Sequence, residues 1–359
     1  MRKILIISSH PSSGWSMIKF SEMVRFAVGQ DSRILNYIPP NRLSSKFTDR
    51  RLKGFAIYLE RKIYSTVYLF CLNKIIKPRV ILLCDHSDSY LVSLISKKKI
   101  IIFCHDLFAI KAMMGEIEGV SQSLRVRLEL KFNLQILKKA SRLIAVSESM
   151  RNEIFKIIPT ATIHVISPTV LPSTYDKIER SILVDYCLLP MNDHWRKNRL
   201  QGITVFSKVH KIFRGKLHLV IVGNDLSFNE LNFIKRESIE SYVILTSNLP
   251  EVQMRNLYKY CKFVLFTSKY EGFGLPIIEA NYHARLAIHT ELPVLDEVAG
   301  GKNISVGINL EHVDWLKVCQ KVQSAIARKS AKRHFENHYS FAIFKSKLDS
   351  ILELEPKSF

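Results

Sequence analysis

The sequence predicts an α/β protein built from two doubly wound domains. Short apolar runs of strand character alternate with longer stretches of helical period along the chain, which is typical of parallel α/β architecture. A chain of 359 residues is long enough for two domains of ordinary size. Because the strand spacing is uneven and glycine turns recur in each half, we expect two open sheets rather than one barrel.

The candidate strands form two series along the chain. Those of the first half are Ile4–Ser8, Val80–Cys84, Ile100–Cys104, Arg142–Val146 and Thr162–Ile166. Those of the second half are Tyr186–Leu189, Leu217–Val222, Tyr242–Leu245, Phe263–Thr267, Leu286–His289 and Ile304–Val306. Prolines and hydroxyl residues interrupt the pattern at Ser167–Thr174, where we expect the linker. We therefore expect domains over residues 1–170 and 171–335, followed by a terminal segment, 336–359, that is helical by period from Ser340 to Leu354.

Charge is concentrated in the first half of the chain. The formal net charge is +21; residues 1–172 carry 27 Lys and Arg against 12 Asp and Glu, whereas the remainder carries 26 against 20. Such a balance predicts an anionic partner, either nucleic acid or an acidic membrane surface. No aromatic-basic recognition motif or helix-turn-helix supports nucleic acid, so we do not expect that partner.

The cysteines and the length of the apolar runs indicate in which cellular compartment the protein lies. The six cysteines are scattered and include no C-x-x-C pair, which favours buried thiols in a reducing compartment over disulfides or a zinc site. No run approaches the roughly 18 apolar residues of a membrane span. We expect a cytoplasmic protein, peripherally attached to the inner face of the membrane.

The most informative stretch is Tyr270–Ala280, with the sequence YEGFGLPIIEA. It follows a strand-like run, and Pro276 suits the first turn of a helix. A strand, a glycine turn and a helix leave unpaired N–H groups at the helix N-terminus, where an anion such as phosphate binds. The carboxylates of Glu271 and Glu279 add acceptors for hydroxyl groups. Phosphate together with several hydroxyls describes a nucleotide-sugar.

The complete string resembles the Glu-x7-Glu signature of GT-B-fold retaining glycosyltransferases of the family 4 type, also called glycosyl transferases group 1. The strand and turn at 219–223 and the run Arg196–Asn198 extend this resemblance over about residues 185–310. It implies two Rossmann-like domains with an interdomain cleft and a terminal helix that crosses back to the N-terminal domain. It also implies a nucleoside-diphosphate sugar as donor, a glycan or lipid-linked acceptor, and no metal or other cofactor. Cell-surface polysaccharide synthesis of the lipopolysaccharide or capsule type is the expected setting, with a hexosyl donor and mannosyl slightly favoured.

The resemblance carries over residue by residue. It implies that Glu279 binds ribose hydroxyls and that Glu271 contacts the phosphate-sugar region of the donor. Lys197 and Arg196 are expected to pair with the diphosphate, whose charge grows as the glycosidic bond breaks. The remaining expected donor-binding residues are Gly14, Gly223, Gly272, Phe273, Gly274 and Leu275.

His105 is the expected catalytic residue of the first domain. It follows a predicted strand directly, at the carboxyl end where α/β folds bind ligands. The family has a histidine near the point of sugar transfer at such a position. The alternative is a histidine that only caps its strand or bonds a neighbour.

One departure from the family pattern leaves other functions open. Leu189–Asn192 lacks the glycine and arginine that the family usually has before the lysine. The chain could therefore be a weakly active or inactive GT-B protein that acts as a binding or scaffold component of glycan assembly. A GT-B nucleotide-sugar epimerase is a further alternative.

Part of the positive charge of the first half lies in and before a helical stretch with aromatic and aliphatic residues. Cations at Arg42, Lys46 and Arg50–Lys53 precede an aromatic and aliphatic stretch up to Tyr68. A basic helix with such a face can lie on anionic lipid. The charge is increased by Lys97, Lys98, Lys99, Arg125, Arg127, Lys131, Lys138 and Lys139. The alternative is that these cations only cover solvated helix faces.

Overall fold

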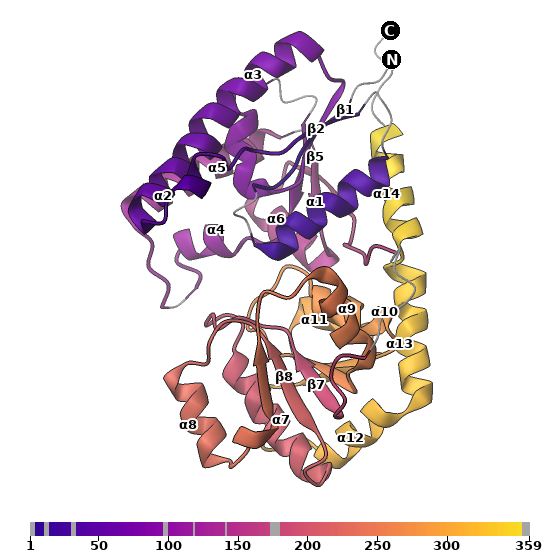
Figure 1. Cartoon of the computed structure of the whole chain (residues 1–359). Coiled ribbons are helices and arrows are strands. Elements are labelled where there is room, and N and C mark those ends of the chain that lie inside the picture. Colours follow the sequence, from indigo (N-terminus) through magenta and orange to yellow (C-terminus); the bar gives the residue numbers. More distant parts are fainter. Residues whose placement is uncertain are drawn as a thin grey trace. The chain divides into compact units, whose positions relative to one another are not determined.

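The computed structural model describes residues 4–10, 14–29, 34–95, 100–117, 119–140, 142–172 and 180–353. The chain divides into two compact units (Figure 1). Unit 1 comprises Met1–Pro168 and Phe344–Phe359, and unit 2 comprises Thr169–Ile343. Each unit has a six-stranded parallel sheet with helices, so the predicted pair of doubly wound α/β domains is confirmed. The cleft between domains stays a prediction, as does the part of the linker at residues 173 and 174, which lies outside the described ranges.

Unit 1 contains a sheet of order β2-β1-β3-β4-β5-β6. Its strands are β1 Ile4–Ile7, β2 Ile34–Tyr37, β3 Val80–Leu83, β4 Ile100–Cys104, β5 Arg142–Ala145 and β6 Thr162–Val165. The central strands are apolar along their whole length because helices cover both faces of a parallel sheet. Strand β2 was not predicted from the sequence. This edge strand has only one fully buried residue, Tyr37, so it lacks the continuous apolar run of the others.

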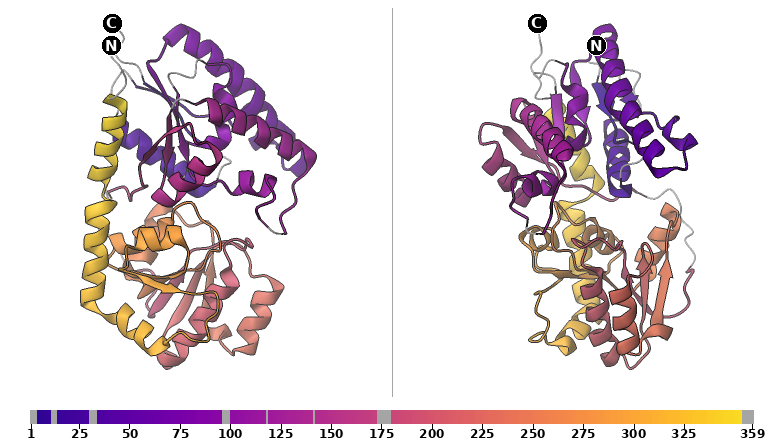
Figure 2. Two further views of the ribbon diagram at one scale, coloured as in Figure 1. Left: turned by 180° about the vertical axis from the view of Figure 1, so that it is seen from behind. Right: turned by 90° about the vertical axis from the view of Figure 1, so that its left-hand side faces the viewer.

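The helices of unit 1 are α1 Trp15–Val28, α2 Arg50–Tyr58, η2 Leu59–Tyr64, α3 Ser65–Ile76, α4 Phe108–Met113, α5 Leu124–Lys139 and α6 Glu148–Ile157, with short 3-10 turns η1 Ser44–Lys46 and η3 His86–Val92. Side chains cap the N-termini of α2, α5 and α6 among these helices. Asp49 accepts from two backbone N–H groups of α2, and Ser123 Oγ accepts from Val126 N at the start of α5. The stretch η2 is a π-helix, so α2, η2 and α3 form one long helical rod (Figures 1 and 2).

The terminal helix α14, Phe341–Glu353, belongs to unit 1 from Phe344 onward. The Phe344 ring packs edge-on against Phe20 of α1, with 6.1 Å between ring centroids. Lys345 Nζ donates to the carbonyl oxygen of Ala27 over 2.9 Å. A segment more than 300 residues away in sequence thus completes the packing around α1.

Unit 2 contains a sheet of order β12-β11-β10-β7-β8-β9. Its strands are β7 Tyr186–Leu189, β8 His218–Val222, β9 Val243–Thr246, β10 Phe263–Phe266, β11 Leu286–Thr290 and β12 Ile304–Val306. Its helices are α7 Arg199–Ile212, α8 Phe228–Arg236, α9 Glu251–Tyr260, α10 Leu275–Tyr282, α11 Pro293–Ala299, α12 Trp315–Gln323 and α13 Ala325–His338, with a 3-10 turn η5 Glu240–Tyr242. Every strand predicted for this unit is present.

Strand order reverses once in each sheet, and that point predicts where a ligand binds. In unit 2 the chain builds β7, β8 and β9 outward and then continues with β10 on the other side of β7. In unit 1 the corresponding reversal lies between β1 and β3. Loops diverge at such a switch point and leave a crevice beyond the carboxyl ends of the strands. Among the helices of the described ranges, none is both long and apolar enough to cross a bilayer.

Candidate functional site

The β10–α10 turn of unit 2 is built around a glycine. Gly274 has φ 128°, a backbone region that favours glycine, and a Cβ at this position would lie 2.9 Å from Leu295. Because Gly274 is also the N-cap, no side chain caps α10. Pro276 then occupies the first turn, as predicted. The result is an α10 N-terminus whose backbone dipoles favour an anion.

Lys197 and Glu271 meet at the switch point of unit 2. Lys197 ends the loop after β7 and Glu271 follows β10, and these strands are neighbours in the sheet. Lys197 Nζ lies 2.6 Å from Glu271 Oε1. The lysine side chain retains 26% exposure and the glutamate 12%, so solvent reaches the ion pair. The structure therefore brings together the expected phosphate cation and one of the two signature carboxylates.

Arg196 is held in the same place by backbone contacts. Its carbonyl oxygen accepts a hydrogen bond from Lys269 N over 2.7 Å, which ties the β7–α7 loop to the β10–α10 loop. Its N–H donates to His194 Nδ1 over 3.4 Å. After Lys197 the chain passes through Asn198 in the left-handed region, and Asn198 O accepts from Thr267 Oγ1 over 3.0 Å. The two loops are thus fixed to each other on both sides of the ion pair.

A buried ion pair, which the sequence analysis missed, supports this loop. Arg199, the first residue of α7, is 1% exposed and makes a bidentate contact with Glu230, at 2.8 Å and 2.6 Å. It also donates to the carbonyl oxygens of Asn224 and Asp225. Burial alone would raise the pKa of Glu230, but hydrogen bonds from Arg199 and Ser227 outweigh it and lower that pKa. The partial signal in the sequence was the Ser227-x-x-Glu230 capping box of α8.

Gly223 has a steric function at the end of β8. A Cβ at this position would lie 2.4 Å from the carbonyl oxygen of Met191, so the β7–α7 loop passes where a side chain would stand. Asn192 Oδ1 accepts from Asn224 N over 3.1 Å, and Asn224 Oδ1 accepts from Asp193 N over 2.5 Å. The atypical Leu189–Asn192 segment is therefore anchored by carboxamide contacts. Since Asn192 is uncharged, the cations that this loop offers are Arg196 and Lys197.

Glu279 lies on the second turn of α10. It accepts a hydrogen bond from the Tyr258 hydroxyl, and burial together with this carboxylate raises the pKa of Tyr258 well above its usual value. Tyr258 belongs to α9, so a neighbouring helix orients the second signature carboxylate. That fixed orientation suits a group expected to accept hydrogen bonds from two adjacent hydroxyls.

The other residues of the predicted turn differ in what they expose. Phe273 is 6% exposed, and its ring packs edge-on against Tyr339 at 5.7 Å. The Phe273 side chain thus belongs to the core, so only its backbone could contact the donor. Gly272 is buried, whereas Leu275 is half-buried at the start of α10.

His105 and Gly14 lie in unit 1, apart from the other predicted site residues in sequence and in fold. His105 follows β4, is 8% exposed, and its Nε2 lies 2.7 Å from the carbonyl oxygen of Cys84. A carbonyl only accepts, so Nε2 carries the proton and Nδ1 is the acceptor. Burial lowers the pKa of this ring and keeps it neutral at neutral pH. Gly14 caps α1 with an ordinary φ of −57° and open space around it, so nothing in the described residues requires glycine there.

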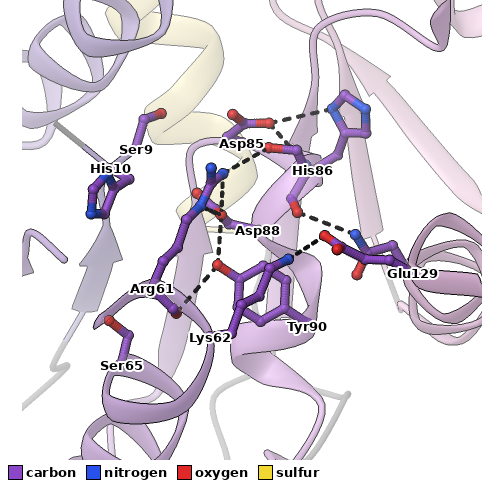
Figure 3. Close-up of polar contacts among 12 residues, drawn as sticks. Ser9, His10, Arg61, Lys62, Ser65, Asp85, His86, Asp88, Tyr90 and Glu129 are labelled. Carbon is purple, nitrogen blue, oxygen red and sulfur yellow. Dashed lines mark hydrogen bonds and ion pairs between the residues drawn. The ribbon is translucent and has the colours of Figure 1, made fainter. Parts of the chain in front are cut away.

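A charged cluster occupies the switch point of unit 1 (Figure 3). Arg61 Nε donates to Asp88 Oδ1 over 2.7 Å, and the Tyr90 hydroxyl donates to the same oxygen over 3.0 Å. Asp85, two residues after the end of β3, accepts from Ser87 N. Burial alone would raise the pKa of Asp85, but His86, His105 and the Ser87 hydrogen bonds outweigh it and lower that pKa. The cation of this cluster is thus engaged by a carboxylate, and the switch point offers mainly acceptors.

No group of three or more His, Cys, Asp and Glu side chains within the described ranges is arranged to hold a metal ion. The metal-independent chemistry implied by the resemblance stays a prediction.

Comparison with known proteins identifies first the fold and then a family for part of unit 2. The structure is similar to sucrose-phosphate synthase from Thermosynechococcus elongatus, with a TM-score of 0.67, 12% identity and coverage of 98% of both chains. It is also similar to WaaG, a glycosyltransferase involved in lipopolysaccharide biosynthesis, with a TM-score of 0.63, 12% identity and coverage of 97% of this chain and 99% of that one. TarM of S. aureus, solved with UDP, gives a TM-score of 0.61 at 18% identity over 82% of this chain and 58% of TarM. These likenesses establish the GT-B fold.

Residues 192–338 match the family of glycosyl transferases group 1. The match begins at Asn192, within the atypical segment, and includes both signature glutamates and the Arg196–Asn198 run. No curated protein sequence matches the chain.

Proposed function

We propose that this chain is a retaining glycosyltransferase that uses a nucleoside-diphosphate sugar as donor. The observation that carries the proposal is the Lys197–Glu271 ion pair at the switch point of unit 2, in front of the uncapped N-terminus of α10. The family match over residues 192–338 and the UDP recorded with TarM support the donor class.

The chemistry follows from the charges at this site. A bound diphosphate competes with Glu271 for Lys197, and the released carboxylate then accepts hydrogen bonds from sugar hydroxyls. When the anomeric C–O bond breaks, its electron pair stays on the diphosphate. Lys197, Arg196 and the α10 N-terminus stabilise that growing charge. The oxygen of the acceptor hydroxyl bonds to the anomeric carbon with retention of configuration, and its proton passes to the departing diphosphate.

The acceptor is a glycan or a lipid-linked glycan of cell-surface polysaccharide synthesis. The charge pattern of unit 1 and the likeness to WaaG favour this class. The switch point of unit 1 holds the Asp85 carboxylate and the neutral ring of His105, both suited to accept hydrogen bonds from hydroxyls. A hexosyl donor, with mannosyl slightly favoured, remains the expected sugar.

The test combines a donor screen with transfer assays. A nucleotide-sugar that raises Tm identifies the donor, because a ligand of the folded state stabilises it by mass action. Transfer from that donor is then measured for the wild type and for Glu271→Gln. We expect Glu271→Gln to lose about 10- to 100-fold in transfer, because one acceptor of the sugar is weakened. Equal rates for the two proteins would contradict the site assignment.

The departure at Leu189–Asn192 favours one second candidate, a donor-binding protein without turnover. Asn192 supplies no positive charge to a leaving diphosphate. The donor would then bind with the same affinity whether or not acceptor is present, and it would never be consumed. That result would support a binding protein over an enzyme.

A further inference from the structure

The helical rod α2–η2–α3 and the neighbouring helix α5 expose an unusual number of large apolar side chains. Every one of them is at least 38% exposed, although most residues of this kind are buried in the sheet core. We call this surface the apolar-basic face. Its apolar members are Leu52, Phe55, Tyr58, Ile63, Tyr64, Val67, Tyr68 and Ile75 on the rod, and Leu124, Val126, Leu128 and Phe132 on α5.

The π-helical stretch keeps the rod's apolar series on one side. Apolar residues recur every three residues before it, at Leu52, Phe55 and Tyr58, and the series continues with Ile63 inside it and Val67, four residues further on. The step from Tyr58 to Ile63 spans five residues and leads into η2, where backbone hydrogen bonds also span five residues. In a regular α-helix a step of five residues would turn Ile63 about 140° away from Tyr58, whereas a π-helical turn keeps the two side chains closer to one side.

Two contacts fix α5 beside the rod. Lys62 of η2 pairs with Glu129 of α5, and the Lys62 ammonium also lies 3.6 Å from the centroid of the Tyr90 ring (Figure 3). The Arg125 guanidinium lies 4.8 Å from the centroid of the Tyr58 ring. The exposed residues of the rod and of α5 therefore meet where Arg125 lies over Tyr58.

The fold of unit 1 does not account for this apolar content. The rod buries a narrow seam, which includes Ala56 and Leu69, against the rest of the unit. A helix that packs on one side only normally carries polar residues on the other side. Here the solvent side carries phenylalanine, tyrosine and branched aliphatic side chains. Contiguous apolar surface of this kind marks an interaction site.

Apart from Glu129, the exposed charges on the same helices are positive. The rod exposes Arg51, Lys53 and Lys74, and α5 exposes Arg125, Arg127, Lys131, Lys138 and Lys139. The acidic residues within these helices are Glu60, which is buried, and Glu129, which is paired with Lys62. At the start of α5, apolar and basic residues alternate from Leu124 to Leu128, and all five are exposed. The partner must therefore accept apolar side chains and supply negative charge next to them.

We propose that the apolar-basic face docks on the surface of an anionic lipid bilayer. Aromatic and aliphatic side chains enter the boundary between headgroups and acyl chains, while arginine and lysine extend to the lipid phosphates. A second copy of this chain fits less well, because a two-fold interface would place the same cations opposite each other. The inference stands on this surface alone and does not depend on the proposed glycosyl transfer.

The test is flotation of the full-length protein with vesicles. One set contains phosphatidylcholine only, and the other contains phosphatidylcholine mixed with phosphatidylglycerol. We expect binding to the mixed vesicles, and weaker binding as salt rises. An Arg51→Gln, Lys53→Gln, Arg127→Gln variant should bind about 100-fold more weakly, since each cation near an anionic surface contributes about fivefold. A Phe55→Ser, Leu128→Ser variant should also lose about 100-fold, or about tenfold for each apolar side chain.

Matched variants of unit 2 serve as controls. Lys208→Gln, Lys216→Gln, Lys329→Gln removes the same charge, and Phe228→Ser, Ile326→Ser removes exposed apolar side chains of similar size. Both should bind vesicles like the wild type, and unchanged far-UV circular dichroism checks the fold of all four variants. The proposal is overturned if the wild type does not float with mixed vesicles, or if control and test variants lose binding equally. It is also overturned if light scattering shows a dimer that only the apolar-basic variants disrupt, since the face would then be a protein interface.

Discussion

The two units share a doubly wound parallel sheet, yet their switch points have opposite chemistry. In unit 2 the loops after β7 and β10 bring Lys197 against Glu271, and solvent reaches both side chains. In unit 1 the loop after β3 brings Asp85 and Asp88 into a buried cluster in which Arg61 is already paired. The switch point of unit 2 offers a cation and a helix N-terminus, whereas that of unit 1 offers buried hydrogen-bond acceptors.

The difference shows how one topology can serve two kinds of ligand. A sheet order only fixes where loops diverge, and the residues in those loops decide what binds there. A cation that an incoming anion can reach suits a diphosphate. A site rich in carboxylates repels phosphate and suits hydroxyl groups.

Substitution in the buried Arg199–Glu230 pair, which supports the β7–α7 loop of unit 2, should have the largest effect on stability. Arg199→Met leaves Glu230 buried without its cation, and removal of one partner of a buried pair costs about 3 to 5 kcal/mol. Urea unfolding measures the change. Arg61→Met, in the buried pair of unit 1, is the matched variant and should destabilise unit 1 without changing donor affinity. A loss of stability below 1 kcal/mol for Arg199→Met would show that this pair does not hold the loop.

Gly223→Ala should destabilise unit 2 because the new methyl group meets the Met191 carbonyl oxygen. Overpacking of this kind costs about 1 to 3 kcal/mol. In unit 1, Gly54→Ala lies on an exposed helix with open space around it and should instead stabilise by about 0.5 to 1 kcal/mol. Thermal unfolding distinguishes the two. The same sign for both substitutions would contradict the close approach at Gly223.

The buried ring of His105 should make unit 1 sensitive to acid. Burial lowers its pKa in the folded state, so below pH of about 6.5 the unfolded chain binds a proton that the folded chain does not. The contribution of His105 to stability is therefore present at neutral pH and is lost as pH falls. Between pH 7.5 and 5.5, His105→Gln should lose about 1 kcal/mol less stability than the wild type, as measured by urea unfolding. Parallel pH profiles for the two proteins would mean that the ring titrates normally.

Asn192→Ala should have the smallest effect. It removes one hydrogen bond, to Asn224 N, which is worth about 1 kcal/mol, and it removes no charge. Donor affinity should fall less than tenfold. A larger loss would mean that Asn192 contacts the donor directly, as the arginine of the usual family pattern would.

The sheet core was predictable from sequence because buried parallel strands are continuously apolar. The edge strand β2 was not, since Ile34 to Tyr37 is mostly half-exposed. The glycine turn and the helix after it were predicted from Gly274 and Pro276, whose backbone requirements are local. The direct contact between Lys197 and Glu271 was not predicted, because it depends on which strands are neighbours.

Long-range pairs explain most of what sequence reasoning missed at the site. Arg199 and Glu230 are 31 residues apart, and neither residue type alone signals a buried partner. The steric function of Gly223 likewise depends on where the backbone of Met191 passes. The π-helical turn has no sequence signal that we can name, although the spacing of Tyr58 and Ile63 fits it.

Isothermal titration of a nucleoside diphosphate tests the central claim most directly. UDP and GDP are titrated into the wild type, Lys197→Ala and Lys269→Ala. Lys269 is an exposed lysine two residues before Glu271, and only its backbone touches the site. We predict that Lys197→Ala weakens binding of the nucleotide that the wild type prefers by about 10- to 100-fold, as expected for a charge-assisted contact. Lys269→Ala should stay within about twofold of the wild type. Equal Kd values for all three proteins would contradict the assignment of the Lys197–Glu271 pair to the donor diphosphate.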